Sequence, residues 1–300
     1  MNQIPAIQNS QKQLERLAAQ RELYSSAKKW HGTQIILTVI LPVVLATVAF
    51  FKTEFAVIAA IFGVLSFLID ISTIEPMIKK RKTKAAKIQE LFDCEVLGLP
   101  KSPLKTVDDI AVEEVLLYYN AHMKISTNVE KIKDWYSPKV GELPLKIGRI
   151  LCQRTNCWWD SKLRQRYSSF LKYTSMFLFA TILIAGFISD LSLINITLIA
   201  GSLIPLFQFC IKQCNDNLDT AKRLDELVLF STQIWNDALT TIYSDESLLN
   251  NSRRLQDEIF EHRSKSPLIL DLYYNFFRDN DEALMNRSSE ILVEEAFNRT

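Results

Sequence analysis

Four long apolar runs stand out from the otherwise polar pattern of the chain. They cover residues 33–51, 55–74, 173–189 and 191–211, and the first contains no charged residue. Each is close to the roughly 20 residues that an α-helix needs to cross the hydrocarbon core of a bilayer. Buried helices of a water-soluble bundle are usually shorter and carry a polar stripe along one side. The pattern therefore predicts four transmembrane helices, which short linkers pair into two hairpins.

The distribution of lysine and arginine predicts how these spans are oriented. Lys28 and Lys29 precede the first span, the basic run "KKRKTKAAK" (residues 79–87) follows the second, and further cations flank the second pair of spans. Lys52 is the only cation at either hairpin tip. Because Lys and Arg concentrate on the cytoplasmic side of membrane proteins, we expect both termini and the middle segment to be cytoplasmic.

The polar segments show helical periodicity, and the alternation typical of strands is hard to find. We expect an all-α membrane protein with two transmembrane helical hairpins (four spans) and helical cytoplasmic extensions. A long helix is predicted from Leu145 through Phe170 into the third span, and Pro42 and Pro205 are expected to kink their spans. The expected segments are an N-terminal cytoplasmic helix (1–32), hairpin 1 (33–74), a cytoplasmic helical segment (75–170), hairpin 2 (171–211) and a C-terminal cytoplasmic helical region (212–300).

Polar residues recur at helical spacing inside two of the spans. They include Ser66, Asp70 and Thr73 on the second span, and Asn195 and Ser202 on the fourth. Polar groups that face lipid are costly, so both stripes should face protein or water. They either pack helices together through small and hydroxyl side chains, or they line a pore once several subunits assemble.

The composition excludes several classes of protein. The 300 residues include 7 glycines, 3 histidines and 5 cysteines, and the net charge is +1. We find no glycine-rich phosphate loop or familiar catalytic motif, and no constellation of a nucleophile with a base or of metal ligands. A net charge this small does not favour binding of a nucleic-acid polymer. We therefore expect no enzymatic activity, no cofactor, no metal and no nucleic-acid polymer as partner.

The stretch "CQRTNCWWD" (residues 152–160) concentrates the most unusual chemistry of the chain. Cys152 and Cys157 are about 140° apart around a helix, and no paired Cys or His accompanies them, so zinc is not expected. The polar residues instead form a stripe that includes Asn156, Asp160 and Arg164. Asp160 and Arg164 have the spacing of a helical ion pair.

Two interpretations of this stretch remain open. Its tryptophans can dock the helix into a cytoplasmic core, or the helix forms a surface that recognises phosphates and bases through arginines and aromatic stacking. The candidate ligand-binding residues are Arg154, Asn156, Trp158, Trp159, Asp160 and Arg164.

Three longer motifs carry a resemblance to a known family. They are "FDCEVLGLP" (92–100), "DWYSPKVGELPLKIGRILCQRTNCWWDSKLRQRY" (134–167) and "SPLILDLYYNFFRDNDEALMN" (266–286). Together with the two pairs of spans, they resemble the bacterial S-4TM family of pore-forming effectors associated with cyclic-oligonucleotide synthases. The resemblance covers nearly the whole chain.

This resemblance implies a role in antiviral defence. In such systems a nucleotidyltransferase senses infection and makes a cyclic nucleotide, and the effector then disrupts the inner membrane so that the infected cell stops growing or dies. The implied location is the bacterial inner membrane. The implied partners are the lipid bilayer, a cyclic oligonucleotide and further copies of the same chain.

Two other classes of function are weighed against this one. A membrane-anchored scaffold would use the cytoplasmic helices to bind a partner protein, and a membrane-embedded enzyme would need a catalytic constellation that the sequence does not display. Nucleotide-dependent ion leakage from liposomes would distinguish a ligand-gated effector from a scaffold.

Overall fold

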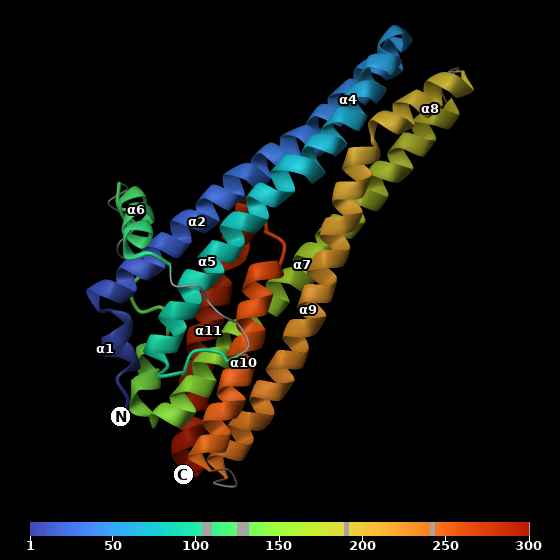
Figure 1. Ribbon diagram of the computed structural model, residues 1–300. Helices are drawn as coiled ribbons and strands as arrows, with labels where there is room; N and C mark the ends of the chain where they lie inside the picture. The colour runs from blue at the N-terminus through green and yellow to red at the C-terminus, as the bar shows by residue number, and fades with distance from the viewer. Residues whose placement is uncertain (104–109, 125–131, 189–191, 241–243, 300) are drawn as a thin grey trace.

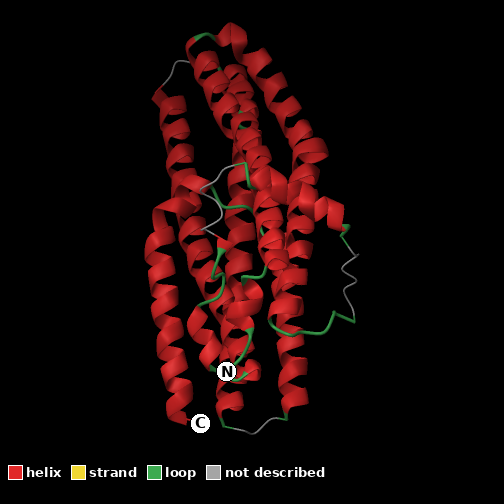
Figure 2. Ribbon diagram, turned by 90° about the vertical axis from the view of Figure 1, so that its left-hand side faces the viewer, coloured by secondary structure: helices red, strands yellow, loops and turns green. Residues whose placement is uncertain are grey.

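The computed structural model describes residues 1–103, 110–124, 132–188, 192–240 and 244–299 of the protein. Within this part of the chain the regular elements are helices and no strand occurs (Figure 2), which confirms the predicted all-α class. The α-helices are α1 (Ile4–Gln8), α2 (Gln11–Ile35), α3 (Leu41–Phe51), α4 (Ala56–Ile69), α5 (Glu75–Val96), α6 (Val112–His122), α7 (Leu145–Ile188), α8 (Leu193–Ser202), α9 (Ile204–Leu239), α10 (Asp245–Lys265) and α11 (Asp271–Arg299).

The first hairpin consists of two helices that continue without a break from polar into apolar sequence. They run over Gln11–Phe51 and Thr53–Val96. The first widens into a π-helical turn at Ile36–Ile40, directly before Pro42, and the second has an equivalent turn at Asp70–Ile74. Because proline has no N–H to donate to the preceding turn, the widened turn accommodates it without ending the helix.

The second hairpin is formed by α7, α8 and α9. Helix α7 is 44 residues long and begins at Leu145, which confirms the predicted helix from the polar segment into the third apolar run. Helices α8 and α9 meet at an angle of 46°. The break lies at Leu203, between Gly201 and Pro205, so the expected kink of the fourth run is confirmed.

Each hairpin continues into its own pair of polar helices. Helix α2 packs along α5, and α7 packs along α9; we call these pairs the first arm and the second arm. Both termini lie at the end of the molecule opposite α4 and α8 (Figure 1). Near the tips, α4 meets α8 so closely that a Cβ atom on Gly63 would lie 2.9 Å from Cα of Ser202. The hairpins therefore touch at the level of their backbones.

Two described helices are long and apolar enough to cross a membrane, namely Gln11–Phe51 and Thr53–Val96. Helices α8 and α9 provide a third candidate if the bent pair counts as one span. Among the described residues α7 does not provide a fourth, and the predicted second tip at 189–191 lies outside this part of the chain. Four spans therefore stay a prediction.

The largest apolar core lies at the end that holds both termini. Phe92 of α5, Ile150 of α7, Trp235 of α9 and Leu248 of α10 are buried together there. Because these residues come from both arms, the core holds the arms together at one end, as the contact of α4 with α8 does near the other.

Candidate functional site

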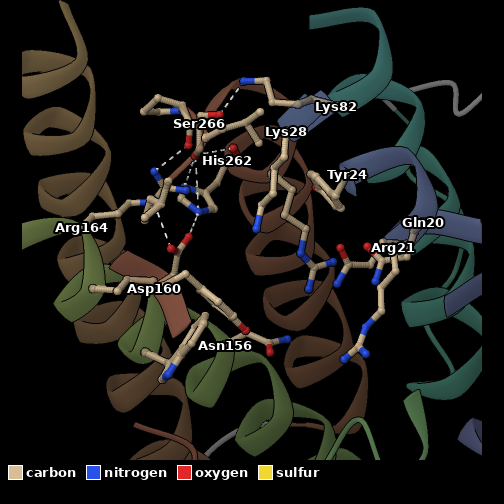
Figure 3. Close-up of a pocket in the computed structure, with 18 of the residues that line it drawn as sticks. Gln20, Arg21, Tyr24, Lys28, Lys82, Asn156, Asp160, Arg164, His262 and Ser266 are labelled. Carbon is tan, nitrogen blue, oxygen red and sulfur yellow. Dashed lines mark hydrogen bonds and ion pairs between the residues drawn. The ribbon is translucent and has the colours of Figure 1, made fainter. Parts of the chain in front are cut away.

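A cavity of about 680 Å³ lies between the two arms. Its walls come from α2 and α5 of the first arm, from α7 and α9 of the second, and from α10 and the segment that follows it (Figure 3). Pockets that bind small molecules typically measure roughly 300 to 1,000 Å³. The cavity is thus large enough for a ligand of several rings, and its position joins helices of both hairpins.

Two polar stripes face each other across this cavity. Gln20, Tyr24 and Lys28 recur at four-residue spacing on α2, and Asn156, Asp160 and Arg164 do the same on α7 (Figure 3). Residues four apart on an α-helix lie one above the other on the same face. Each stripe therefore occupies one face of its helix, and in the structure that face lines the cavity.

Asp160 lies at the centre of a polar chain on the α7 wall. Its Oδ1 lies 3.0 Å from Nε of Arg164, and its Oδ2 lies 2.6 Å from Nε2 of His262. Burial alone would raise the pKa of the Asp160 carboxyl, but Arg164 and His262 outweigh it and hold this pKa well below its ordinary range. Burial lowers the pKa of His262, against the opposing hydrogen bond and charge of Asp160.

Arg164 and His262 are themselves held by further contacts. Nη1 of Arg164 donates to Oδ1 of Asn217 at 2.9 Å and to the carbonyl of Pro267 at 3.0 Å. Nδ1 of His262 lies 2.9 Å from Oγ of Ser266. The α7 wall is therefore a fixed network, and the guanidinium of Arg164 is largely occupied by protein acceptors.

Lys82 of α5 is a buried cation without a carboxylate partner. The side chain is 7% exposed, and its Nζ donates to the carbonyls of Ser266 and Lys265. No carboxylate among the described residues forms an ion pair with it. Burial, assisted by the charge of Arg164, lowers the pKa of Lys82 to about 8. A buried charge is costly unless it is paired, and this one is offset only by two backbone carbonyls and by the charges of Asp216 and Glu75, which form no ion pair with it.

Arg263 contrasts with Lys82, because a carboxylate holds it. Its Nη1 pairs with Oδ2 of Asp93, which also accepts from Nε2 of Gln256 at 2.8 Å. The hydroxyl of Tyr136 donates to the other oxygen of Asp93 at 2.7 Å. This network fixes α10 against α5 and closes one side of the cavity.

Aromatic rings with adjacent cations complete the lining. The guanidinium of Arg21 lies 5.6 Å from the ring centroid of Trp135, and Nζ of Lys28 lies 5.1 Å from that of Tyr274. Trp159 meets Tyr274 edge to face, with centroids 5.6 Å apart. Such rings are the surfaces on which nucleobases stack.

The structure brings four of the six predicted ligand-binding residues to this cavity. Asn156, Trp159, Asp160 and Arg164 line it, whereas Arg154 and Trp158 are not among its lining residues. The α2 stripe and Lys82 were not predicted. The periodicity of Gln20, Tyr24 and Lys28 was a usable signal, but Lys82 was hidden in a basic run that topology already explained.

The predicted pore-lining residues lie mostly inside the subunit. Ser66, Asp70 and Ser202 are buried, Asn195 is half-buried and Thr73 is exposed. Nε2 of Gln34 donates to Oδ1 of Asp70 at 2.7 Å, which links the two helices of the first hairpin. In this arrangement the buried polar groups pack helices together, and a pore lined by them would require the hairpins to repack.

The cysteines do not form a metal or redox site in the described part of the chain. No group of three or more His, Cys, Asp or Glu residues with metal-binding geometry occurs there, and all five cysteines are free. Cys152 and Cys157 are buried in different apolar clusters. This agrees with their predicted positions on different faces of one helix.

Comparison with known proteins gives one family and one curated relative. The family model described as the SMODS-associating 4TM effector domain matches residues 2–292. The chain is 26% identical over 295 residues to the probable CBASS effector molecule IK1_05631 of Bacillus cereus (strain VD146), covering 93% of this chain and 94% of that protein. No solved structure matches.

Proposed function

Because the chain belongs to the SMODS-associating 4TM effector domain family, we propose that it is a membrane effector of CBASS, the cyclic-oligonucleotide-based defence against phage. In this proposal a cyclic oligonucleotide binds in the cavity between the arms, and assembled copies of the chain then permeabilise the inner membrane. The full length of the similarity to a probable CBASS effector supports this role.

The observation that carries the ligand assignment is the unpaired charge of Lys82. A phosphodiester would supply the negative charge that this buried ammonium lacks, as a charge-assisted hydrogen bond. Lys28 and Lys29 add positive charge on the α2 side, and Trp135 and Tyr274 offer rings for stacking. Phosphate and base recognition are therefore combined in one cavity.

The continuity of the helices suggests how ligand binding in the cavity is transmitted to the apolar hairpins. Helices α2 and α5 belong to the same continuous helices as the first hairpin, and α7 runs into the second. A ligand that contacts both arms stabilises the angle between the arms at which it fits best. It shifts the equilibrium between two such arrangements of the arms by the difference in its affinity for them. Repacking of α4 against α8 would then expose the polar groups of Ser66 and Ser202.

The proposed topology has four spans with both termini in the cytoplasm. Segments 1–32, 75–170 and 212–300 would form the sensing part, and the hairpins at 33–74 and 171–211 the membrane part. The common location of both termini at the end opposite α4 and α8 supports this arrangement (Figure 1). The chain would act as a switch without catalysing a reaction.

Leakage from liposomes tests the function directly. We expect purified protein in liposomes to release an entrapped dye when a cyclic oligonucleotide is added on the side of the termini, and to hold it with linear nucleotides of the same composition. Leakage that is unchanged by every cyclic oligonucleotide, together with stable capture of a partner protein, would favour the membrane-anchored scaffold instead.

Nucleotide affinity is expected to fall as the pH rises through about 8. The pKa of Lys82 is lowered to about 8 by burial and by Arg164, against the opposing effects of Asp216 and Glu75. Only the ammonium form neutralises a phosphate, so affinity is constant below about pH 7 and falls towards tenfold per pH unit well above 8. Calorimetric titration between pH 6.5 and 9.5, with Lys82→Met as control, measures this dependence. A flat profile for the unmodified protein would contradict it.

A further inference from the structure

Two buried carboxamides in the cavity have no protein partner. Gln20 of α2 is 2% exposed and Gln89 of α5 is 5% exposed, and both line the cavity. No hydrogen bond of either side chain is found within the described part of the chain. Neither carboxamide is among the fully enclosed polar atoms that lack a partner, so their polar atoms are open to the cavity that they line. Both groups are therefore suited to bind something that enters the cavity.

Several buried glutamines outside the cavity lining are held by protein groups, although Nε2 of the buried Gln13 has no partner among the described residues. Nε2 of Gln153 donates to the carbonyl of Ser252 and to Oε1 of Gln256, each at 2.9 Å. Gln8 donates to the carbonyl of Tyr136 at 3.0 Å and accepts from its N–H at 2.8 Å. Gln20 and Gln89 differ from Gln153 and Gln8 in that neither end of the carboxamide is held by another protein group of the described segments.

The position of Gln89 relates it to the unpaired cation. Gln89 follows Lys82 by seven residues on α5, which places the two side chains on the same face about two turns, or roughly 10 Å, apart. Gln20 and Lys28 are related similarly on the neighbouring helix α2. One ligand can therefore present a phosphate to a lysine and a base to a glutamine along the same wall.

The chemistry of a carboxamide limits which base it recognises. It offers one acceptor and two donors, and its characteristic bidentate partner is the N6 and N7 edge of adenine, whereas guanine O6 and N7 are read by arginine or lysine. The guanidinium groups of Arg164 and Arg263 are engaged by Asp160 and Asp93. In the proposed function the lysines of the cavity bind phosphates, so the groups left to read a base edge are mainly the carboxamides.

We propose that Gln20 and Gln89 read a base edge and select cyclic oligonucleotides that contain adenine. This inference rests on the proposed function, in which the cavity binds the cyclic oligonucleotide. Trp135 and the pair of Trp159 with Tyr274 provide the stacking surfaces, and Lys82 holds a phosphate of the same ligand.

Affinity measurements with defined probes test this selectivity. The full-length protein in detergent is titrated with cyclic di-AMP, cyclic tri-AMP, cyclic di-GMP and cyclic di-UMP. We expect at least one adenine ligand to bind about tenfold or more tightly than the guanine and uracil ligands, since a bidentate base contact contributes about 5- to 150-fold discrimination. Gln89→Met and Gln20→Met should each lose most of this preference.

Gln11→Met is the matched control, because Gln11 lies on the same helix as Gln20 but is exposed and pairs with Glu15. It should leave the preference for adenine ligands unchanged.

Equal affinity of the unmodified protein for guanine and adenine ligands would overturn the adenine selectivity while leaving the proposed function intact. A preference that survives in both cavity variants would overturn the role of the two glutamines. Failure of every cyclic probe to bind would overturn both proposals.

Discussion

Lys82→Met is expected to lower the affinity for a cyclic oligonucleotide by at least about 30-fold and to abolish nucleotide-dependent leakage. Removing one partner of a buried, hydrogen-bonded charge pair costs about 2–5 kcal/mol of binding free energy. Within the described part of the chain Lys82 forms no ion pair, so the substitution leaves no ion-pair partner without its cation. Methionine also has a similar length and a flexible apolar side chain.

The same substitution should leave the free energy of unfolding unchanged or raise it. Below about pH 8 the folded protein bears the cost of a buried ammonium, and its pKa of about 8 lies under that of an exposed lysine. The cost is relieved as the pH rises from about 8 towards 10.5, so stability of the unmodified protein should increase over that range. Loss of binding without loss of stability would distinguish a ligand-binding lysine from a structural one.

Lys80→Met is the matched control for this prediction. Lys80 lies two residues away on α5 but is exposed, outside the cavity lining. We expect the affinity of the Lys80→Met protein for the cyclic oligonucleotide to differ from that of the unmodified protein by less than about threefold, because a surface lysine makes a small, screened contribution to binding. Unaltered binding by Lys82→Met, or equal losses in both variants, would remove Lys82 from the site.

The sequence predicted the α7 wall of the cavity better than the α2 wall. Helical spacing placed Asn156, Asp160 and Arg164 on one face, and that face lines the cavity. Periodicity defines a face of one helix but not the helix that lies opposite it. The stripe of Gln20 and Tyr24 was therefore present in the sequence without any sign that it faces α7.

Burial of individual residues was a second property that the sequence did not reveal. Lys80 and Lys82 belong to the same basic run, yet the first is exposed and the second is buried against the carbonyl of Ser266. That difference depends on α10 and the segment after it, more than 180 residues away in sequence. Similarly, the spacing of Ser66 and Asp70 predicted contact with protein or water, but only the fold shows that they are buried within the subunit.

Arg253→Met is expected to destabilise the protein by about 3–5 kcal/mol. Arg253 is 7% exposed and its partner Glu90 is 4% exposed, with Nη2 of the arginine 2.6 Å from Oε1 of the glutamate. Removing one partner of a buried ion pair leaves the other charge uncompensated, which has a cost of this size. The same guanidinium donates to the carbonyl of Pro100 at 3.0 Å, so a further hydrogen bond is lost. Chemical denaturation in detergent micelles measures the change.

The exposed pair of Arg223 with Glu258 provides the control, because it also joins two helices but both side chains are about half exposed. Arg223→Met should change stability by less than about 1 kcal/mol. In the Arg253→Met background, Glu90→Gln should recover part of the loss, because it removes the uncompensated charge while keeping an acceptor for Gln256. No recovery would mean that lost packing, and not the buried charge, causes the effect.

The position of this pair connects stability to ligand binding. Arg253 holds α10 against α5, and the same helix carries His262 and Arg263 at the cavity. If α10 is loosened, the contact of Lys82 with the carbonyl of Ser266 is loosened with it, although Arg253 itself does not line the cavity. Arg253→Met should therefore weaken nucleotide binding as well as folding, and adding Glu90→Gln should restore both together. Recovery of stability without recovery of binding would show that α10 does not position the nucleotide site.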